Sequence, residues 1–205
     1  MTDKLKKYLL VSGCLGVFAA AMTVPFVYET KTLWYKIGFD RTLLRAGQLC
    51  GLVTFLLLLV QVLLANRGRL LEQSFGVPKL LEYHRKNGVL IGLFALLHLL
   101  GVLIPENLGN LPLSMRFWPE LVGAGLFLLI ALMAVTSRYR LQLGLDYPKW
   151  RYSHRIFGYL AIGLASLHVL FVSESFSGWL PRLALIGLVG GCVVRVVLLK
   201  WFRTK

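Results

Sequence analysis

The chain has 205 residues, of which 57% are hydrophobic and 16% charged, and its mean hydropathy of +0.70 is typical of a membrane protein rather than a soluble domain. The net charge of +14 and the pI near 10.1 would suit a nucleic-acid-binding protein. The basic residues lie between apolar runs instead of along one face, however, which is the usual orientation signal of a membrane protein. We therefore expect a lipid bilayer, and no nucleic acid, as the partner.

The first apolar stretch covers residues 8–28 and could be either a retained helix or a cleaved leader. A signal peptide ending near Ala19–Ala21 and a lipoprotein processing site at Cys14 are the two alternatives. Apolar character continues to Tyr28, which favours an uncleaved first helix. The three cysteines, Cys14, Cys50 and Cys192, stand in separate apolar stretches without a CxxC pair, so we interpret them as packing residues.

Six apolar stretches have about the length that crosses ~30 Å of hydrocarbon. Short polar connectors join them, so the sequence predicts one domain over residues 1–205, an all-α membrane protein built as a six-transmembrane-helix bundle. The expected spans are 8–28, 44–65, 84–104, 117–136, 153–173 and 180–200.

The distribution of lysine and arginine predicts how these spans are oriented. The N-terminus, the second and fourth connectors and the C-terminus hold 17 of the 23 Lys and Arg residues. Because cytoplasmic segments are enriched in these residues, both termini should face the cytoplasm. The first connector, with Lys31, Lys36, Arg41 and Arg45, fits this assignment least well.

All four histidines belong to one duplicated pattern. His84-Arg85-Lys86-Asn87-Gly88 is followed by His98, and His154-Arg155-Ile156-Phe157-Gly158 is followed by His168. In each copy the second histidine comes fourteen residues after the first, which on a helix means about 21 Å of rise and a rotation only about 40° from whole turns. Each helix should therefore carry two imidazoles on one face at two depths.

The third and fifth spans must run parallel, because one span separates them. Parallel helices place His84 level with His154, near the cytoplasmic face, and His98 level with His168, nearer the outer face. The first pair alone could be ordinary interfacial residues, whereas His98 and His168 lie within apolar runs, where an ionisable group is costly and is by default functional.

Two imidazoles at each level, without Cys or a carboxylate, are too few for a closed zinc site. A haem iron needs only axial ligands, and its apolar porphyrin suits a helix bundle. We therefore predict two stacked bis-His haem b sites between the third and fifth helices. The absence of C-x-x-C-H excludes covalently attached haem.

Four further residues are candidates for contact with the haems. Gly88 and Gly158 lie one turn from their histidines and would leave room for the ring. Arg85 and Arg155 could pair with propionates, although contact with lipid head groups explains them equally well.

The paired histidines on the third and fifth of six spans resemble the ferric reductase-like transmembrane domain, over roughly residues 42–200. NADPH oxidases, ferric reductases and the bacterial haem subunit MsrQ share this domain. The resemblance implies that His84 and His154 ligate the inner haem b, that His98 and His168 ligate the outer one, and that flavin or NAD(P)H enters only through a partner protein or a further domain.

With both axial positions filled, a haem transfers single electrons. We therefore expect a membrane oxidoreductase, or its electron-transfer subunit, in the bacterial inner (plasma) membrane. A cytoplasmic flavoprotein reductase or a quinol would donate electrons, and ferric iron, oxygen or a periplasmic reductase would accept them. The connector from Pro105 to Arg116 is the expected docking surface for the acceptor.

Three alternatives remain at this point. The short length and the lack of a flavin domain resemble MsrQ, the haem subunit of a periplasmic methionine sulfoxide reductase system. A histidine-dependent ion transporter would need polar groups along a pathway, and the spans offer chiefly Gln48, Gln61 and Glu120. A purely structural subunit would not require the repeated histidines.

Overall fold

The computed structural model describes residues 3–106 and 114–201. This part of the chain is helical and contains no strand. Six of its helices are long and apolar enough to cross a membrane, which confirms the expected all-α fold with six candidate spans. The seven α-helices of the described residues are α1 (Asp3–Val27), α2 (Gly38–Asn66), α3 (Arg69–Phe75), α4 (Val77–Leu103), α5 (Trp118–Arg138), α6 (Tyr147–Val172) and α7 (Trp179–Trp201).

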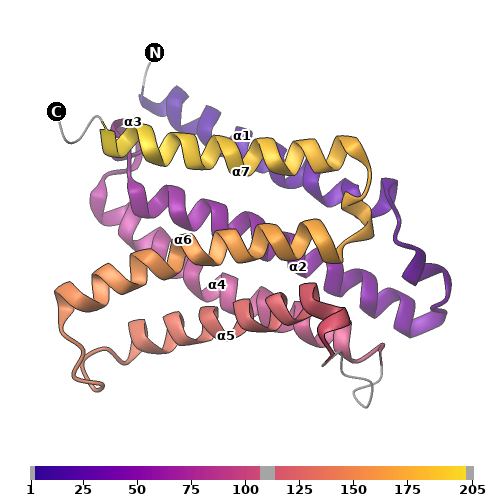
Figure 1. Cartoon of the computed structure of the whole chain (residues 1–205). Coiled ribbons are helices and arrows are strands. Elements are labelled where there is room, and N and C mark those ends of the chain that lie inside the picture. Colours follow the sequence, from indigo (N-terminus) through magenta and orange to yellow (C-terminus); the bar gives the residue numbers. More distant parts are fainter. Residues whose placement is uncertain (1–2, 107–113, 202–205) are drawn as a thin grey trace.

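The long helices lie side by side as one bundle, and α1 begins at the same end at which α7 finishes (Figure 1). We name the two ends of the bundle by their histidines. The His84 end carries the connections from α2 to α4 and from α5 to α6, and the His98 end carries the other three. The parallel direction of α4 and α6 follows from this arrangement.

Most of the long helices begin earlier than hydropathy predicts. The second and fifth spans were expected from residues 44 and 153, whereas α2 begins at Gly38 and α6 at Tyr147. The reason is that hydropathy marks only the apolar part of a helix, whereas the helix continues into the polar membrane interface with side chains that are no longer apolar. Asp146 illustrates this, since its carboxylate accepts a hydrogen bond from the Lys149 backbone N–H at the start of α6. The short helix α3 was not expected from the sequence.

Helix α2 is the centre of the bundle and packs most extensively against α4. Its core side chains include Phe55, Leu56 and Leu59, which cluster with buried residues of the other long helices from α4 to α7. Most apolar residues on the outer faces are exposed, as expected where lipid is the solvent.

Two glycines allow α2 and α4 to touch through their backbones. A Cβ on Gly101 would lie 2.6 Å from the Gly47 Cα, and a Cβ on Gly47 would lie 2.7 Å from the Gly101 carbonyl carbon. Small residues permit this kind of close approach in membrane helix pairs. The contact brings the backbone of α2 beside the last turns of α4, close to His98.

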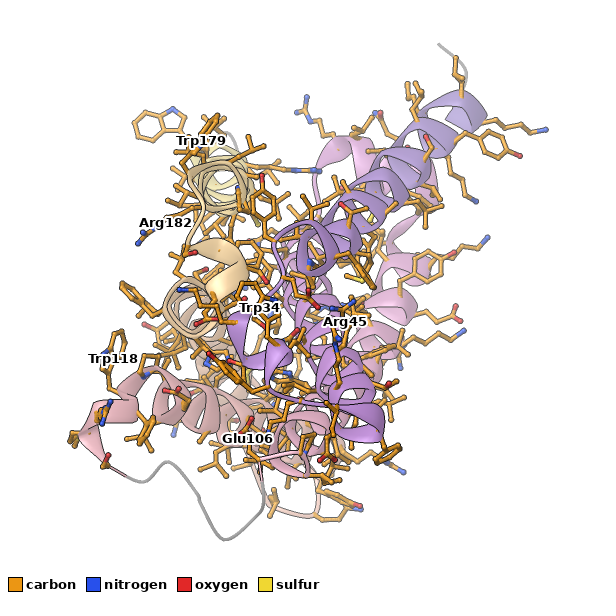
Figure 2. The ribbon with its side chains drawn as sticks, turned by 90° about the vertical axis from the view of Figure 1, so that its right-hand side faces the viewer. Trp34, Arg45, Glu106, Trp118, Trp179 and Arg182 are labelled. Atoms are coloured by element: carbon orange, nitrogen blue, oxygen red, sulfur yellow. The ribbon has the colours of Figure 1, made fainter. Side chains whose placement is uncertain are left out.

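The 3-10 helix η1 (Lys31–Trp34) lies at the His98 end, and the side chain of its Leu33 is buried. Seen along the bundle from this end, Trp34 and Arg45 lie near the middle, and Trp118, Trp179 and Arg182 lie at the outer edge (Figure 2). The peripheral tryptophans suit anchors at a membrane interface.

Candidate metal centre: two histidine pairs

The structure brings the four histidines together as two pairs. The ring centroids of His98 and His168 are 6.1 Å apart with an interplanar angle of 77°, and those of His84 and His154 are 6.4 Å apart at 69°. Each pair takes one histidine from α4 and one from α6, as parallel helices require. The fourteen-residue spacing within each helix places the pairs at two levels of the bundle.

Main-chain carbonyls hold both rings of the His98–His168 pair. The Nδ1 atom of His98 lies 2.9 Å from the Gly47 carbonyl oxygen, and that of His168 lies 2.8 Å from the Pro119 carbonyl oxygen. A carbonyl only accepts hydrogen bonds, so each Nδ1 carries the proton in these contacts. The other ring nitrogen, Nε2, is then left with a free lone pair, which is the form in which a neutral histidine ligates a metal.

A glycine also lies directly behind each of these two rings. A Cβ on Gly51 would lie 2.7 Å from His98 Nδ1, and a Cβ on Gly123 would lie 2.6 Å from His168 Nδ1. Gly51 follows Gly47 by one helical turn, and Gly123 follows Pro119 by the same interval. Helices α2 and α5 thus present the same feature, a carbonyl acceptor and a glycine one turn later, to the two histidines.

The surroundings of His84 are different, because a side-chain amide replaces the carbonyl. The Gln61 Nε2 atom donates to the His84 carbonyl oxygen at 3.0 Å and lies 3.3 Å from the His84 ring Nε2. The Gln61 oxygen accepts from Asn87 Nδ2 at 2.7 Å, and the same Asn87 nitrogen donates to the Leu57 carbonyl. The amide is therefore fully oriented, whereas His84 Nδ1 is buried without a hydrogen-bond partner in the described part of the chain.

His154 has two neighbours on its own side of the bundle. Its Nδ1 lies 3.4 Å from the Ser137 hydroxyl, and its ring centroid lies 5.1 Å from that of Trp150. The Ser137 hydroxyl donates its proton to the Met133 carbonyl at 2.5 Å, so towards His154 it can only accept. This contact is long and weak compared with the carbonyl bonds at the other pair.

The four further candidate residues all lie near the His84 end. Arg85 and Arg155 are exposed there, where either propionates or lipid head groups could be their partners. A Cβ on Gly88 would lie 3.3 Å from the Gln61 amide nitrogen, and one on Gly158 would meet only the Met133 Cε at 3.9 Å. The room beside Gly158 is therefore open, and that beside Gly88 is bounded by Gln61.

The donor set fits a haem better than a protein-only metal site. Among residues 3–106 and 114–201, no three His, Cys, Asp or Glu side chains gather where they could hold an ion, so each level offers two imidazoles only. Ring centroids roughly 6 Å apart are what two imidazoles show when each binds one metal at about 2 Å from opposite sides. The Nδ1 atom of His84 has no hydrogen-bond partner among the described residues, so the rings of this pair are oriented by fewer hydrogen bonds than those of the His98–His168 pair.

Sequence reasoning missed most of the residues that surround the rings. The backbone carbonyls of Gly47 and Pro119 could not be predicted as partners, because every residue has a carbonyl and the residue type does not distinguish these two. Gln61 could have been found, because it is one of the few polar residues of its span and lies fourteen residues after Gly47, the same interval that separates the histidines. Helix α2 runs antiparallel to α4, so this interval places Gln61 at the level of His84.

Six apolar helices long enough to cross a membrane, with two histidine pairs between α4 and α6, define the class of an all-α membrane protein. The family described as "Ferric reductase like transmembrane component" matches residues 50–165, more than half of the chain. The chain belongs to this family, which indicates a membrane oxidoreductase or electron-transfer role. The matched segment contains His84, His98 and His154 and ends three residues before His168.

A relative with a similar sequence is an uncharacterized protein of Archaeoglobus fulgidus. It is 27% identical over 153 residues, which cover 70% of this chain and 84% of that protein. No solved structure matches significantly.

Proposed function

We propose that this protein carries electrons across a membrane through two b-type haems, one held by His84 and His154 and the other by His98 and His168. The observation that supports this most directly is the meeting of four widely separated histidines as two pairs with similar ring separations. When bound, each haem would supply a one-electron couple whose potential depends on its ligands, its burial and local charge.

The chain's own residues would orient the histidine rings and keep water away from the centre of the bundle. Helices α4 and α6 fix the two levels, and the carbonyls of Gly47 and Pro119 orient the rings at the His98 end. Apolar side chains of α2, including Phe55 and Leu56, keep water from the centre of the bundle. Such a dry interior is needed if electrons, and not ions, are to cross.

The direction of transfer follows from the proposed orientation. Helix α1 begins and α7 ends at the His84 end, which also carries most of the basic residues, so this end would face the cytoplasm. A flavoprotein reductase or a quinol would then donate to the His84–His154 pair, and ferric iron, oxygen or a periplasmic reductase would be reduced near the His98–His168 pair. Residues 107–113 of the expected docking connector lie outside the described residues.

A visible absorption spectrum of the purified protein tests this function. We expect a Soret band, sharp α bands after reduction, and two haems per chain by pyridine haemochrome against protein mass. A colourless protein that remains so after reconstitution with haemin would contradict the proposal, and would instead favour an ion transporter or a structural subunit. A saturated ratio of one would mean that one pair holds no haem.

A further inference from the structure

The two histidine pairs differ in the hydrogen bonds that their rings make. We propose that Gln61 is a positioning residue that competes for the ring nitrogen of His84, so that the His84–His154 pair holds its haem less tightly than the His98–His168 pair. This inference rests on the proposed function, because it concerns the two haems assigned there, but it does not depend on which end faces the cytoplasm.

At the His98 end, both rings donate a proton to a carbonyl oxygen, at 2.9 Å for His98 and 2.8 Å for His168. A histidine that donates its second N–H in this way is a more basic ligand and is fixed in one tautomer and one orientation. A more basic ligand stabilises the oxidised metal, which lowers the potential and slows dissociation. The glycines behind the rings allow this geometry, because a Cβ on Gly51 would overlap the His98 ring.

At the His84 end, the hydrogen bond runs in the opposite sense. The Gln61 amide nitrogen has two protons; it donates one to the His84 carbonyl oxygen at 3.0 Å, and it lies 3.3 Å from the His84 ring Nε2. An amide N–H cannot accept, so the ring nitrogen must accept. A donor at this nitrogen withdraws the lone pair that a metal would use, and it leaves the buried Nδ1 proton of His84 without an acceptor.

Neighbouring side chains prevent Gln61 from reversing its amide. Its oxygen is held by Asn87 Nδ2 at 2.7 Å, and Asn87 is itself buried and bonded to the Leu57 carbonyl. Exchange of the oxygen and nitrogen of Gln61 would place two donors together at Asn87 and two acceptors together at the His84 carbonyl. His154 does not compensate, because its Nδ1 contact with the Ser137 hydroxyl is 3.4 Å long.

Transfer of haem from the loaded protein to apomyoglobin measures the strength of each pair. The wild-type protein should lose haem in a fast and a slow phase, with the fast phase absent in His84→Ala and the slow phase absent in His98→Ala. Gln61→Leu removes the competing donor, so we expect its fast phase to slow by about fivefold, the effect of one hydrogen bond. A redox titration of the wild-type protein should show the higher potential for the haem of the His84–His154 pair, because the Nδ1–H of His84 has no acceptor among the described residues. Gln61→Leu should leave this potential nearly unchanged, because Gln61 competes for the ring nitrogen only while no metal holds it.

Gln48→Leu is the matched control, since Gln48 is also a part-buried glutamine of α2 but donates to the Thr30 hydroxyl and not towards a histidine. It should change neither phase. The inference is overturned if the fast phase belongs to the His98–His168 pair, or if Gln61→Leu and a second variant, Gln61→Met, leave the fast phase unchanged or accelerate it. A wild-type protein that binds no haem would instead overturn the proposed function itself.

Discussion

His98 of α4 and His168 of α6 lie with their ring centroids 6.1 Å apart, and each ring contacts a backbone carbonyl of a different neighbouring helix. This arrangement ties four helices, α2, α4, α5 and α6, to one pair of side chains. The two histidines should therefore act as one unit.

Single and double replacements of this pair test that unit. His98→Ala and His168→Ala should each remove the same spectral component, and the double variant should lose no more than either single variant, because residues that serve one site are not additive. Low-temperature reduced-minus-oxidised spectra and haem stoichiometry provide the measurement. His84→Ala, the control at the other level, should retain the component that His98→Ala loses. If His98→Ala and His84→Ala remove the same component and His168→Ala a different one, the pairing is wrong.

The close approach of α2 to the His98 ring gives a second prediction. A Cβ on Gly51 would lie 2.7 Å from His98 Nδ1, so Gly51→Ala should push the ring from the Gly47 carbonyl. The ring is the end of a side chain and can turn away, so we expect loss of the haem at this level while the helical content by circular dichroism is kept. Gly187→Ala is the control, because nothing lies within 4 Å of a Cβ at that glycine of α7. Two haems with unchanged spectra in Gly51→Ala would contradict this geometry.

The sequence was sufficient for the fold class and for the meeting of the histidine pairs, because both follow from long-range regularities. Apolar length marks the spans, and the number of spans between two helices determines whether they run parallel. Contacts made by backbone atoms cannot be predicted from apolar length or from the number of spans. The carbonyl of Pro119 became a partner of His168 only through the packing of α5 against α6, which no residue pattern records.

The basic first connector is the poorest fit to the charge rule, and in the structure three of its basic side chains pair with acidic ones. Arg41 and Arg45 both pair with Glu29, and Lys36 pairs with Glu106 at 3.3 Å. These contacts neutralise much of the positive charge at the His98 end. The charge rule counts lysines and arginines along the sequence, so it does not register acidic partners that folding brings beside them.

The Glu29 cluster gives a prediction for the dependence of stability on pH. The hydrogen bond from Arg41, with the charge of Arg45 adding to it, holds the pKa of the Glu29 carboxyl below its usual range. A lowered pKa in the folded state means that the contribution to stability is present above the unfolded value of about 4.3 and is lost as the pH falls through the folded value. Wild type should therefore melt above Glu29→Gln at neutral pH in detergent, and the difference should vanish in acid.

The side chains of the cluster are partly exposed, so high salt should reduce the same difference at neutral pH. The measurement is the melting temperature of both proteins from neutral pH to below pH 4, at low and high ionic strength. A difference that grows as the pH falls would show that Glu29 is not stabilised as a carboxylate.

The last prediction concerns orientation, which determines the direction of electron flow. Ser114 is exposed at the His98 end, before α5, and Gln73 is exposed on α3 at the His84 end. In a background in which Cys14, Cys50 and Cys192 are replaced by serine or alanine, a membrane-impermeant thiol reagent added to intact cells should modify Ser114→Cys and not Gln73→Cys. The reason is that the positively charged connectors of the His84 end are retained in the cytoplasm. Both cysteines should react after the cells are opened, which shows that each is accessible. Modification of Gln73→Cys alone in intact cells would show that the bundle has the opposite orientation. The proposed donor would then have to reach the His98–His168 pair first.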